Sequence, residues 1–241
     1  MALASNNLRQ DNQAVYVLHS YPFKETSLVV ELFSQQFGRV AAVAKGARRP
    51  RSAMRGMLQS FQLLSGTWSG KNELKTLHSL DWAHGLVNLQ GEALMCGFYM
   101  NELLLRLLPR EDAHEALFDY YQATLSTLSQ TTALATHLRR FELKLLQELG
   151  YAVPLMADEH GEIISAEKQY RYEAEHGACA LNAARNGVQL SGSTLLDMAK
   201  EDYENSLTQS QSKQLMRYLL AHYLGDKPLH TRQLLMDLQE L

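Results

Sequence analysis

Alternating apolar and polar residues over the first 80 positions predict a series of short strands. The strands are expected at residues 14–21, 26–34, 38–45, 58–70 and 71–80. We expect Pro22 to end the first strand, and Val15, Val17 and His19 to share one of its faces. Five short strands without a long helix predict a small closed barrel. The OB-fold is the best-known five-stranded version and commonly binds oligonucleotides, while an SH3-like barrel is the alternative.

After residue 81 the apolar residues recur at helical spacing. Helices are predicted at residues 86–108, 112–129, 133–149, 193–200, 208–224 and 231–240, and short extended segments at 162–164, 169–172 and 188–190. Pro109 and Gly150 stand where two helices should end, and Ser191 or Ser193 can cap another. The chain is therefore predicted to be an α+β multi-domain protein. An N-terminal five-stranded OB-fold β-barrel at residues 1–80 precedes a mainly α-helical domain at 81–241, which has a small irregular β insertion near 151–190.

The net charge of −3 hides an asymmetry between these two parts. Residues 1–80 contain ten Lys and Arg against four Asp and Glu, a charge of +6, so the remainder carries −9. A basic first part and an acidic second part indicate two modules with different partners.

The basic residues gather in and around the stretch from Gly38 to Gly56. No acidic residue lies between Glu31 and Glu73, whereas seven cations do: Arg39, Lys45, Arg48, Arg49, Arg51, Arg55 and Lys71. Such a block repels itself unless an anion lies against it. Because the planar Arg side chain suits phosphate oxygens and stacks on bases, the stretch predicts a nucleic-acid contact surface. The alternative is a solvated, disordered hairpin tip, which the same Gly, Pro, Ser and Arg composition also produces.

Aromatic residues interleave with these cations, and most must fill the barrel. They are Tyr16, Tyr21, Phe23, Phe33, Phe37, Phe61 and Trp68. We expect no more than two of them to face solvent, where a ring can stack on a base.

Motifs for bond-making chemistry are absent, and we expect a protein that is not an enzyme. The chain has no HExxH, no Gly-x-Ser-x-Gly and no glycine-rich phosphate loop. Its two cysteines, Cys96 and Cys179, form no C-x-x-C, which excludes a zinc ribbon and a disulfide framework and fits a reducing compartment. The first residues are not those of a signal peptide, and no apolar run is long enough to span a membrane.

A second cationic site is suggested by the predicted helix at 133–149. Arg139 and Arg140 follow an apolar ridge, and Lys144 lies one turn beyond Arg140. This pattern is typical of a solvated helix face. It also fits an anion site beside an apolar pocket, of the kind that holds an acidic peptide tail.

Several strings in the chain closely resemble the RecO family of DNA repair proteins. They are VYVLHSYPFKETSLVVELFSQQFGRVAAVAKGARR, LKTLHS, YMNELLLRLL, LRRFELKLLQELGY and YLGDKPLHTR. The resemblance implies an N-terminal OB-fold, a C-terminal helical domain and a recombination mediator of the RecF pathway. Such a protein binds single- and double-stranded DNA and anneals complementary strands coated with single-stranded DNA-binding protein, whose acidic C-terminal tail it grips. With RecR it helps to load the RecA recombinase.

The resemblance also assigns roles to residues. Arg39, Lys45, Arg48, Arg49 and Arg51 become DNA contacts, with Arg55 and Lys71 in the same charged set. Arg139 and Arg140 become the site for the partner's tail, with Leu143 and Leu146 as its apolar wall. Many members carry a four-cysteine zinc site after the LGY segment, but here that segment continues without a cysteine until Cys179. We therefore expect no metal and no cofactor, no contact with a membrane, and a place in the bacterial cytoplasm at the nucleoid.

Two other classes of function fit the same residues. One is an RNA-binding OB module, which preference for RNA over DNA of matched sequence would favour. The other is a protein-interaction scaffold whose basic loop meets an acidic partner, which absence of nucleic-acid affinity at low salt would favour. A hydrolase is the remote third, because no catalytic set is visible.

Overall fold

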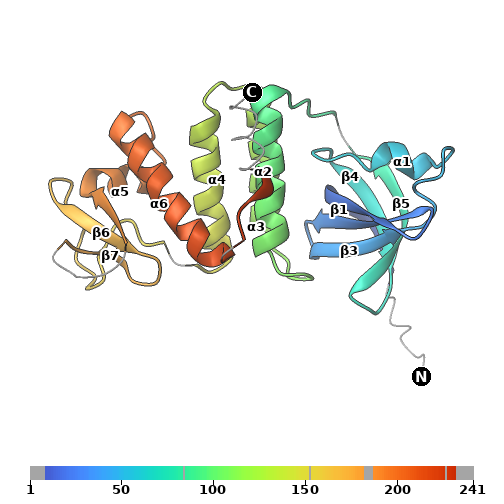
Figure 1. Cartoon of the computed structure of the whole chain (residues 1–241), viewed down its shortest axis with the longest axis horizontal. Coiled ribbons are helices and arrows are strands. Elements are labelled where there is room, and N and C mark those ends of the chain that lie inside the picture. The colour runs from blue at the N-terminus through green and yellow to red at the C-terminus, as the bar shows by residue number, and fades with distance from the viewer. Residues whose placement is uncertain (1–8, 84, 152, 182–186, 226, 232–241) are drawn as a thin grey trace. The chain divides into compact units, whose positions relative to one another are not determined.

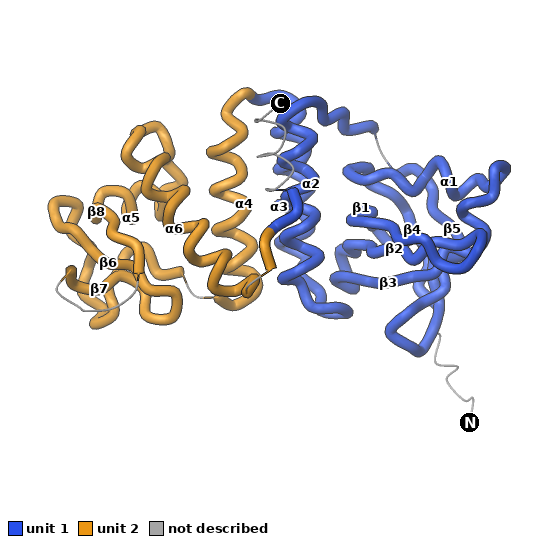
Figure 2. Tube along the Cα trace, viewed as in Figure 1, with its two compact units in different colours: residues 1–131, 229–241 blue, residues 132–228 orange. Residues whose placement is uncertain are grey.

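A computed structural model describes residues 9–83, 85–151, 153–181, 187–225 and 227–231 of the chain. Contacts divide the chain into two compact units, residues 1–131 with 229–241 and residues 132–228 (Figure 2). The chain thus leaves the first unit after residue 131 and returns to it at residue 229.

Five strands of the first unit close into a barrel with the order β1-β2-β3-β5-β4 (Figure 1). The strands are β1 (Arg9–Phe23), β2 (Ser27–Ser34), β3 (Gly38–Ala44), β4 (Leu64–Ser69) and β5 (Leu74–Trp82). Neighbouring strands are antiparallel except β3 and β5, which are parallel. Apolar side chains such as Val30, Val40 and Trp68 fill the interior. This OB-like barrel, followed by helices, confirms the predicted fold class.

The first strand is longer than its sequence predicts. Pro22 was expected to end it, but Pro22 pairs with Leu28 and the strand continues to Phe23. A proline is tolerated here because it lies at the strand's end, where the ladder needs few further donors.

The fourth strand is shorter than the predicted stretch 58–70. It begins only at Leu64, and a short helix that the alternation did not predict, α1 (Ala53–Met57), precedes the intervening residues. Met54 and Met57 of α1 pack against the barrel core. These contacts anchor the C-terminal end of the cationic stretch on the barrel core.

A bulge at Leu18 divides β1 into two halves. Val17 and His19 pair with consecutive residues of β2, so Leu18 has no Cα partner there. An extra residue inverts the alternation of a strand. Before the bulge Val15 and Val17 point into the core, and after it His19 and Tyr21 are exposed. The expected grouping of His19 with Val15 and Val17 is wrong for this reason.

The outer face of the first half of β1 is covered by helix α3 (Glu115–Leu128). Tyr16 and Phe33 each pack on Phe118 and Tyr121, with ring centroids 5.0 to 5.8 Å apart. Burial raises the pKa of Tyr16, and burial together with Tyr16 raises that of Tyr121, so both phenols stay neutral. The barrel and α3 thus share one apolar interface.

The amide of Asn101 joins helix α2 (Gly91–Leu107) to the bulge. Its Nδ2 donates to the Leu18 carbonyl at 3.0 Å, and its Oδ1 accepts from the Tyr121 hydroxyl at 2.6 Å. Asn101 is only 2% exposed. A buried carbonyl needs a hydrogen-bond donor. The Asn101 side chain supplies the donor for the Leu18 carbonyl at the bulge, and its bond to Tyr121 links α2 to α3.

The segment after α2 runs beside β3. Arg39 forms a parallel bridge with Arg110, and the Glu111 amide donates to the Arg39 carbonyl at 3.0 Å. A Cβ at Gly38 would lie 1.8 Å from the carbonyl oxygen of Asp112, and Gly38 has a φ of +61°. Both the contact and the backbone conformation therefore require glycine at this position.

The second unit combines three helices with a small sheet of order β7-β6-β8. Its elements are α4 (Leu134–Glu148), β6 (Gln169–Glu173), β7 (Gly177–Ala180), β8 (Val188–Ser191), α5 (Gly192–Ala199) and α6 (Ser206–Leu224). The Ser191 side chain caps α5 by accepting from the Thr194 amide at 3.3 Å, as predicted. β7 was not predicted, and the expected strand at 162–164 is only an isolated bridge at Ile163. Except for Thr231, the predicted helix at 231–240 lies outside the described residues.

Glu102 of α2 binds the returning chain. Its carboxylate accepts from the His230 amide at 2.7 Å, the Thr231 amide at 2.9 Å and the Thr231 hydroxyl at 2.7 Å. Burial alone would raise the pKa of Glu102, but the hydrogen bonds from Thr231 and His230 outweigh it and hold the pKa below its ordinary value.

We predict that Glu102→Gln lowers the free energy of unfolding at pH 7 by about 1–3 kcal/mol, because charge-assisted hydrogen bonds are lost. A depressed pKa stabilises the fold above the unfolded-state pKa, and that stabilisation is lost as the pH falls through the folded-state pKa. Urea unfolding of the wild type and Glu102→Gln between pH 7 and pH 3 should therefore show that the difference in their free energies of unfolding decreases as the pH falls. A stability difference that does not change with pH would contradict a stabilising role for the charge of the Glu102 carboxylate.

Candidate nucleic-acid interface

The cations that follow β3 lie on a folded loop, which we call the basic segment (residues 45–55). Gly46 has a φ of +68°, and successive turns are closed by Arg49 N to Gly46 O and Ser52 N to Arg49 O, both at 3.0 Å. Its five cations are exposed: Lys45, Arg48, Arg49, Arg51 and Arg55. Within the described part of the chain none of them is in an ion pair. Their charges are therefore available to an outside anion.

Arg48 connects the basic segment to the turn between β1 and β2. Its amide donates to the Thr26 carbonyl at 2.9 Å, and its guanidinium lies 3.5 Å from the Lys24 carbonyl and 3.3 Å from that of Glu25. Carbonyl acceptors orient the guanidinium without removing its charge. The two loops therefore form one surface.

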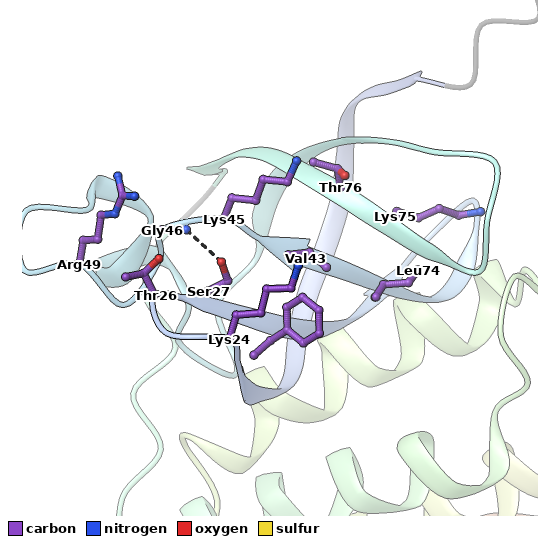
Figure 3. A pocket seen from close by; sticks show the side chains of 11 residues that line it. Lys24, Thr26, Ser27, Val43, Lys45, Gly46, Arg49, Leu74, Lys75 and Thr76 are labelled. Carbon is purple, nitrogen blue, oxygen red and sulfur yellow. Dashed lines mark hydrogen bonds between the residues drawn. The ribbon is translucent and has the colours of Figure 1, made fainter.

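A cavity of about 400 Å³ opens between these loops and the start of β5. Figure 3 shows Arg49 at one end of it, Lys75 at the opposite end, and Lys24 and Lys45 between them. The Lys75 ammonium lies 2.5 Å from the Glu111 carboxylate, so its charge is partly neutralised. This place, between the β1–β2 and β4–β5 loops on the face of β2 and β3, is where OB-folds hold oligonucleotides.

Lys24 and Lys75 were missed by the sequence reasoning. Each lies far along the chain from the basic segment, and only the pairing of β3 with β2 and β5 brings the three segments together. The available signal was the position of Lys24 in a β-hairpin turn of the predicted barrel. A search for cations close in sequence cannot detect it.

Arg39 lies in different surroundings from the other cations. Its Nη1 lies 3.2 Å from Oε2 of the buried Glu31, and its Nε donates to the Leu108 carbonyl at 2.9 Å. Arg110 pairs with the same Glu31 and with Glu73. Only 17% of the Arg39 side chain is exposed. Arg39 therefore neutralises a buried carboxylate, and we leave it out of the proposed DNA contacts.

The other predicted residues of the barrel lie at its surface. Lys71 is exposed in the β4–β5 turn, three residues before Leu74 at the cavity, and Arg55 is exposed on α1. Among the aromatic residues considered above, Tyr21 is 45% exposed and Phe23, at the cavity, is half-buried. Phe33 and Trp68 belong to the core.

The two arginines of α4 are engaged within the second unit. Arg139 lies 2.6 Å from the buried carboxylate of Glu142. Arg140 donates to the Glu201 carbonyl at 2.6 Å and lies over the Tyr203 ring, 5.9 Å from its centroid. Since 31% of the Arg140 side chain is exposed against 16% for Arg139, Arg140 is the more accessible cation.

The leucines expected beside these arginines do not form an open wall. Leu143 is 5% exposed and Leu146 is fully buried, because both pack in the core of the unit. Sequence periodicity places apolar residues on a helix face but does not tell whether that face is covered.

Metal-ligating and membrane-spanning features were also sought. Among the described residues no three His, Cys, Asp or Glu side chains are grouped so as to hold a metal ion. None of the helices that the structure describes is both long enough and apolar enough to cross a membrane.

Comparison with known proteins gives consistent matches along the chain. The family model "Recombination protein O N terminal" matches residues 9–86, and "Recombination protein O C terminal" matches residues 88–233. The chain is 55% identical over 239 residues to the DNA repair protein RecO of Nitrosospira multiformis, covering 97% of this chain and 98% of the relative. It is 49% identical to RecO of Thiobacillus denitrificans (98% and 96% covered) and 49% identical to RecO of Dechloromonas aromatica (98% and 100% covered).

Proposed function

Because the chain belongs to the recombination protein O (RecO) family of DNA repair proteins, we propose that it is a mediator that acts directly on DNA strands. In this proposal it binds single- and double-stranded DNA and anneals complementary strands that carry single-stranded DNA-binding protein. With RecR it then assists the loading of RecA. Its place in the cell would be at the bacterial nucleoid.

The observation that carries the proposal is the unpaired charge of the basic segment. Exposed cations from two segments of the chain, Lys24 and the basic segment, line one cavity on the face that OB-folds use for oligonucleotides. Phosphates would release condensed counterions on binding there, which supplies affinity without reading sequence. A mediator that works on any damaged site needs affinity of this kind.

Annealing by such a surface requires no chemical step. Two complementary strands repel each other because both are polyanions, and a basic barrel that neutralises phosphates lowers this barrier. Base pairing then supplies the free energy, so neither ATP nor a catalytic residue is needed. We therefore propose that the protein is not an enzyme.

For the partner's tail we propose the neighbourhood of Arg140. An acidic peptide needs an accessible cation, and Arg140 is the more exposed of the two arginines, held in place by the buried Tyr203 ring beneath it. The negative charge of the second part of the chain offers RecR a surface of opposite sign to the barrel.

The experiment that tests the proposal is annealing of two complementary DNA strands, each coated with single-stranded DNA-binding protein, without ATP. We expect acceleration that is lost when the coating protein lacks its acidic tail. Acceleration of naked strands alone would remove the tail contact and keep the DNA role. No acceleration on either substrate would favour the scaffold, and stronger binding to RNA of matched sequence would favour the RNA-binding module.

We predict that Arg140→Gln slows annealing of coated strands about 10-fold or more and leaves annealing of naked strands unchanged, because one charge-assisted contact to the tail is lost. Lys144→Gln is the matched control, since Lys144 lies one turn along the same helix, is 33% exposed and pairs with Glu148. Equal effects of the two substitutions, or an equal loss on naked strands, would contradict a specific tail site.

A further inference from the structure

The floor of the cavity is apolar, which phosphate binding does not require. Val43 points outward there, because its neighbours Ala42 and Ala44 point into the barrel core. Leu74, at the start of β5, is 42% exposed and lines the same cavity. Figure 3 shows Val43 between Lys24 and Thr76, with Leu74 beside it.

An aromatic ring, Phe23, completes this lining. The bulge at Leu18 sets its direction, because the inverted alternation puts His19, Tyr21 and Phe23 on the outer face of β1. The Lys24 ammonium lies 5.3 Å from the centroid of the Phe23 ring. The Phe23 ring is half-buried and lies at the cavity, with a cation over it. Such a ring can stack on another planar group.

We propose that this cavity receives one unpaired nucleotide of a DNA strand, with its base against Phe23 and Leu74 and its phosphates on Lys45 and Arg49. The inference rests on the proposed DNA binding and adds to it the part of the strand that is recognised. It makes this cavity the element that distinguishes a single strand from a duplex.

The apolar lining selects for an unpaired base. A duplex presents phosphates and groove edges while its base faces are stacked internally, so Phe23 and Leu74 would have nothing to cover. An unpaired base has two free faces that lose contact with water when they stack. The volume of about 400 Å³ lies within the range of roughly 300–1,000 Å³ for small-molecule pockets, which suits a single nucleotide.

Polar groups at the rim are placed for the edge of a base. Ser27 Oγ lies 3.4 Å from the Gly46 amide, which holds the hydroxyl at the cavity (Figure 3). Thr26 and Thr76 line the cavity with it. Hydroxyls both donate and accept, so they accommodate any of the four bases. The site is therefore expected to select unpaired strands without selecting a sequence.

The test compares binding of a 15-nucleotide single strand and of the corresponding duplex over a series of salt concentrations. We expect Phe23→Ala and Leu74→Ala each to weaken single-strand binding about 5- to 100-fold and to change duplex binding less than two-fold. The salt dependence should stay the same, since no phosphate contact is removed. Trp82→Ala is the matched control, because Trp82 is 41% exposed at the other end of β5 and should change neither affinity.

A second measurement uses the wild-type protein, so that it does not depend on the folding of a variant. A strand of the same length made of abasic residues keeps every phosphate but offers no base to stack. It should bind the wild type 5- to 100-fold more weakly than thymidine strands, and this difference should shrink in Phe23→Ala. Equal affinity for the two strands, or equal loss on strand and duplex in the variant, would overturn the base pocket while the DNA role stands. Failure of the wild type to bind any DNA would overturn both.

Discussion

A variant in which Arg48, Arg49 and Arg51 are all replaced by Gln is expected to bind DNA about 100- to 500-fold more weakly than the wild type in 0.1 M salt. These exposed side chains have no ion pair with another described residue, so each can neutralise one phosphate. Each contact contributes a slope of about 0.7 for a single strand and about 0.9 for a duplex in a plot of log affinity against log salt. Three lost contacts therefore lower the slope by about 2 to 3.

The measurement is a salt titration of binding between 0.05 and about 0.5 M, for both forms of DNA. The matched control replaces Lys168, Lys200 and Lys213 of the second unit by Gln, because these exposed lysines give the same change in net charge. If the control lowers the slope as much, the effect is one of overall charge and the basic segment is not the interface. An unchanged slope in the arginine variant would exclude the segment directly.

Replacing Asn101 by Leu is expected to lower the free energy of unfolding by about 2–4 kcal/mol. The substitution keeps the number and branching of the side-chain heavy atoms but removes the donor to the Leu18 carbonyl and the acceptor of the Tyr121 hydroxyl. The Leu18 carbonyl lies at a bulge in a buried part of β1, where an unsatisfied carbonyl costs about 1–3 kcal/mol. For a domain with a typical stability of about 5–15 kcal/mol, this is a large fraction.

Urea unfolding of Asn101→Leu, Tyr121→Phe and the double variant separates the two bonds. Tyr121→Phe removes one hydrogen bond and should cost about 1 kcal/mol. The double variant should cost less than the sum of the single ones, because both partners of the Asn101–Tyr121 bond are absent together. A cost of Asn101→Leu no larger than that of Tyr121→Phe would show that the Leu18 carbonyl does not depend on this amide.

An element of the fold could be predicted from the sequence wherever a pattern within that element alone determines its structure. Alternation and helical periodicity located the barrel and the helices, and residue type limited the cap of α5 to Ser191 or Ser193, of which the structure uses Ser191. The bulge at Leu18 was not evident. No residue type marks the residue that is inserted at a bulge. Its effect appears only in the register between β1 and β2.

The candidate site was predictable only in its contiguous part. The basic segment forms a run in the sequence, whereas Lys24 and Lys75 join it through strand pairing. Arg39 shows what a run of cations in the sequence leaves out. It belongs to the same run, but its partners Glu31 and Arg110 are set by the tertiary fold, and a charge count cannot show that a cation is already neutralised.

The hydrogen bonds of Glu102 also fix an order of events during synthesis. The ribosome adds residues 230 and 231 only after the whole of the second unit, residues 132–228. The second unit can therefore fold while the carboxylate of Glu102 still lacks the amides of His230 and Thr231. The barrel, although synthesised first, belongs to the unit that is completed after the second unit. A nascent chain thus gains the hydrogen bonds that Glu102 makes to residues 230 and 231 only after the second unit has been synthesised.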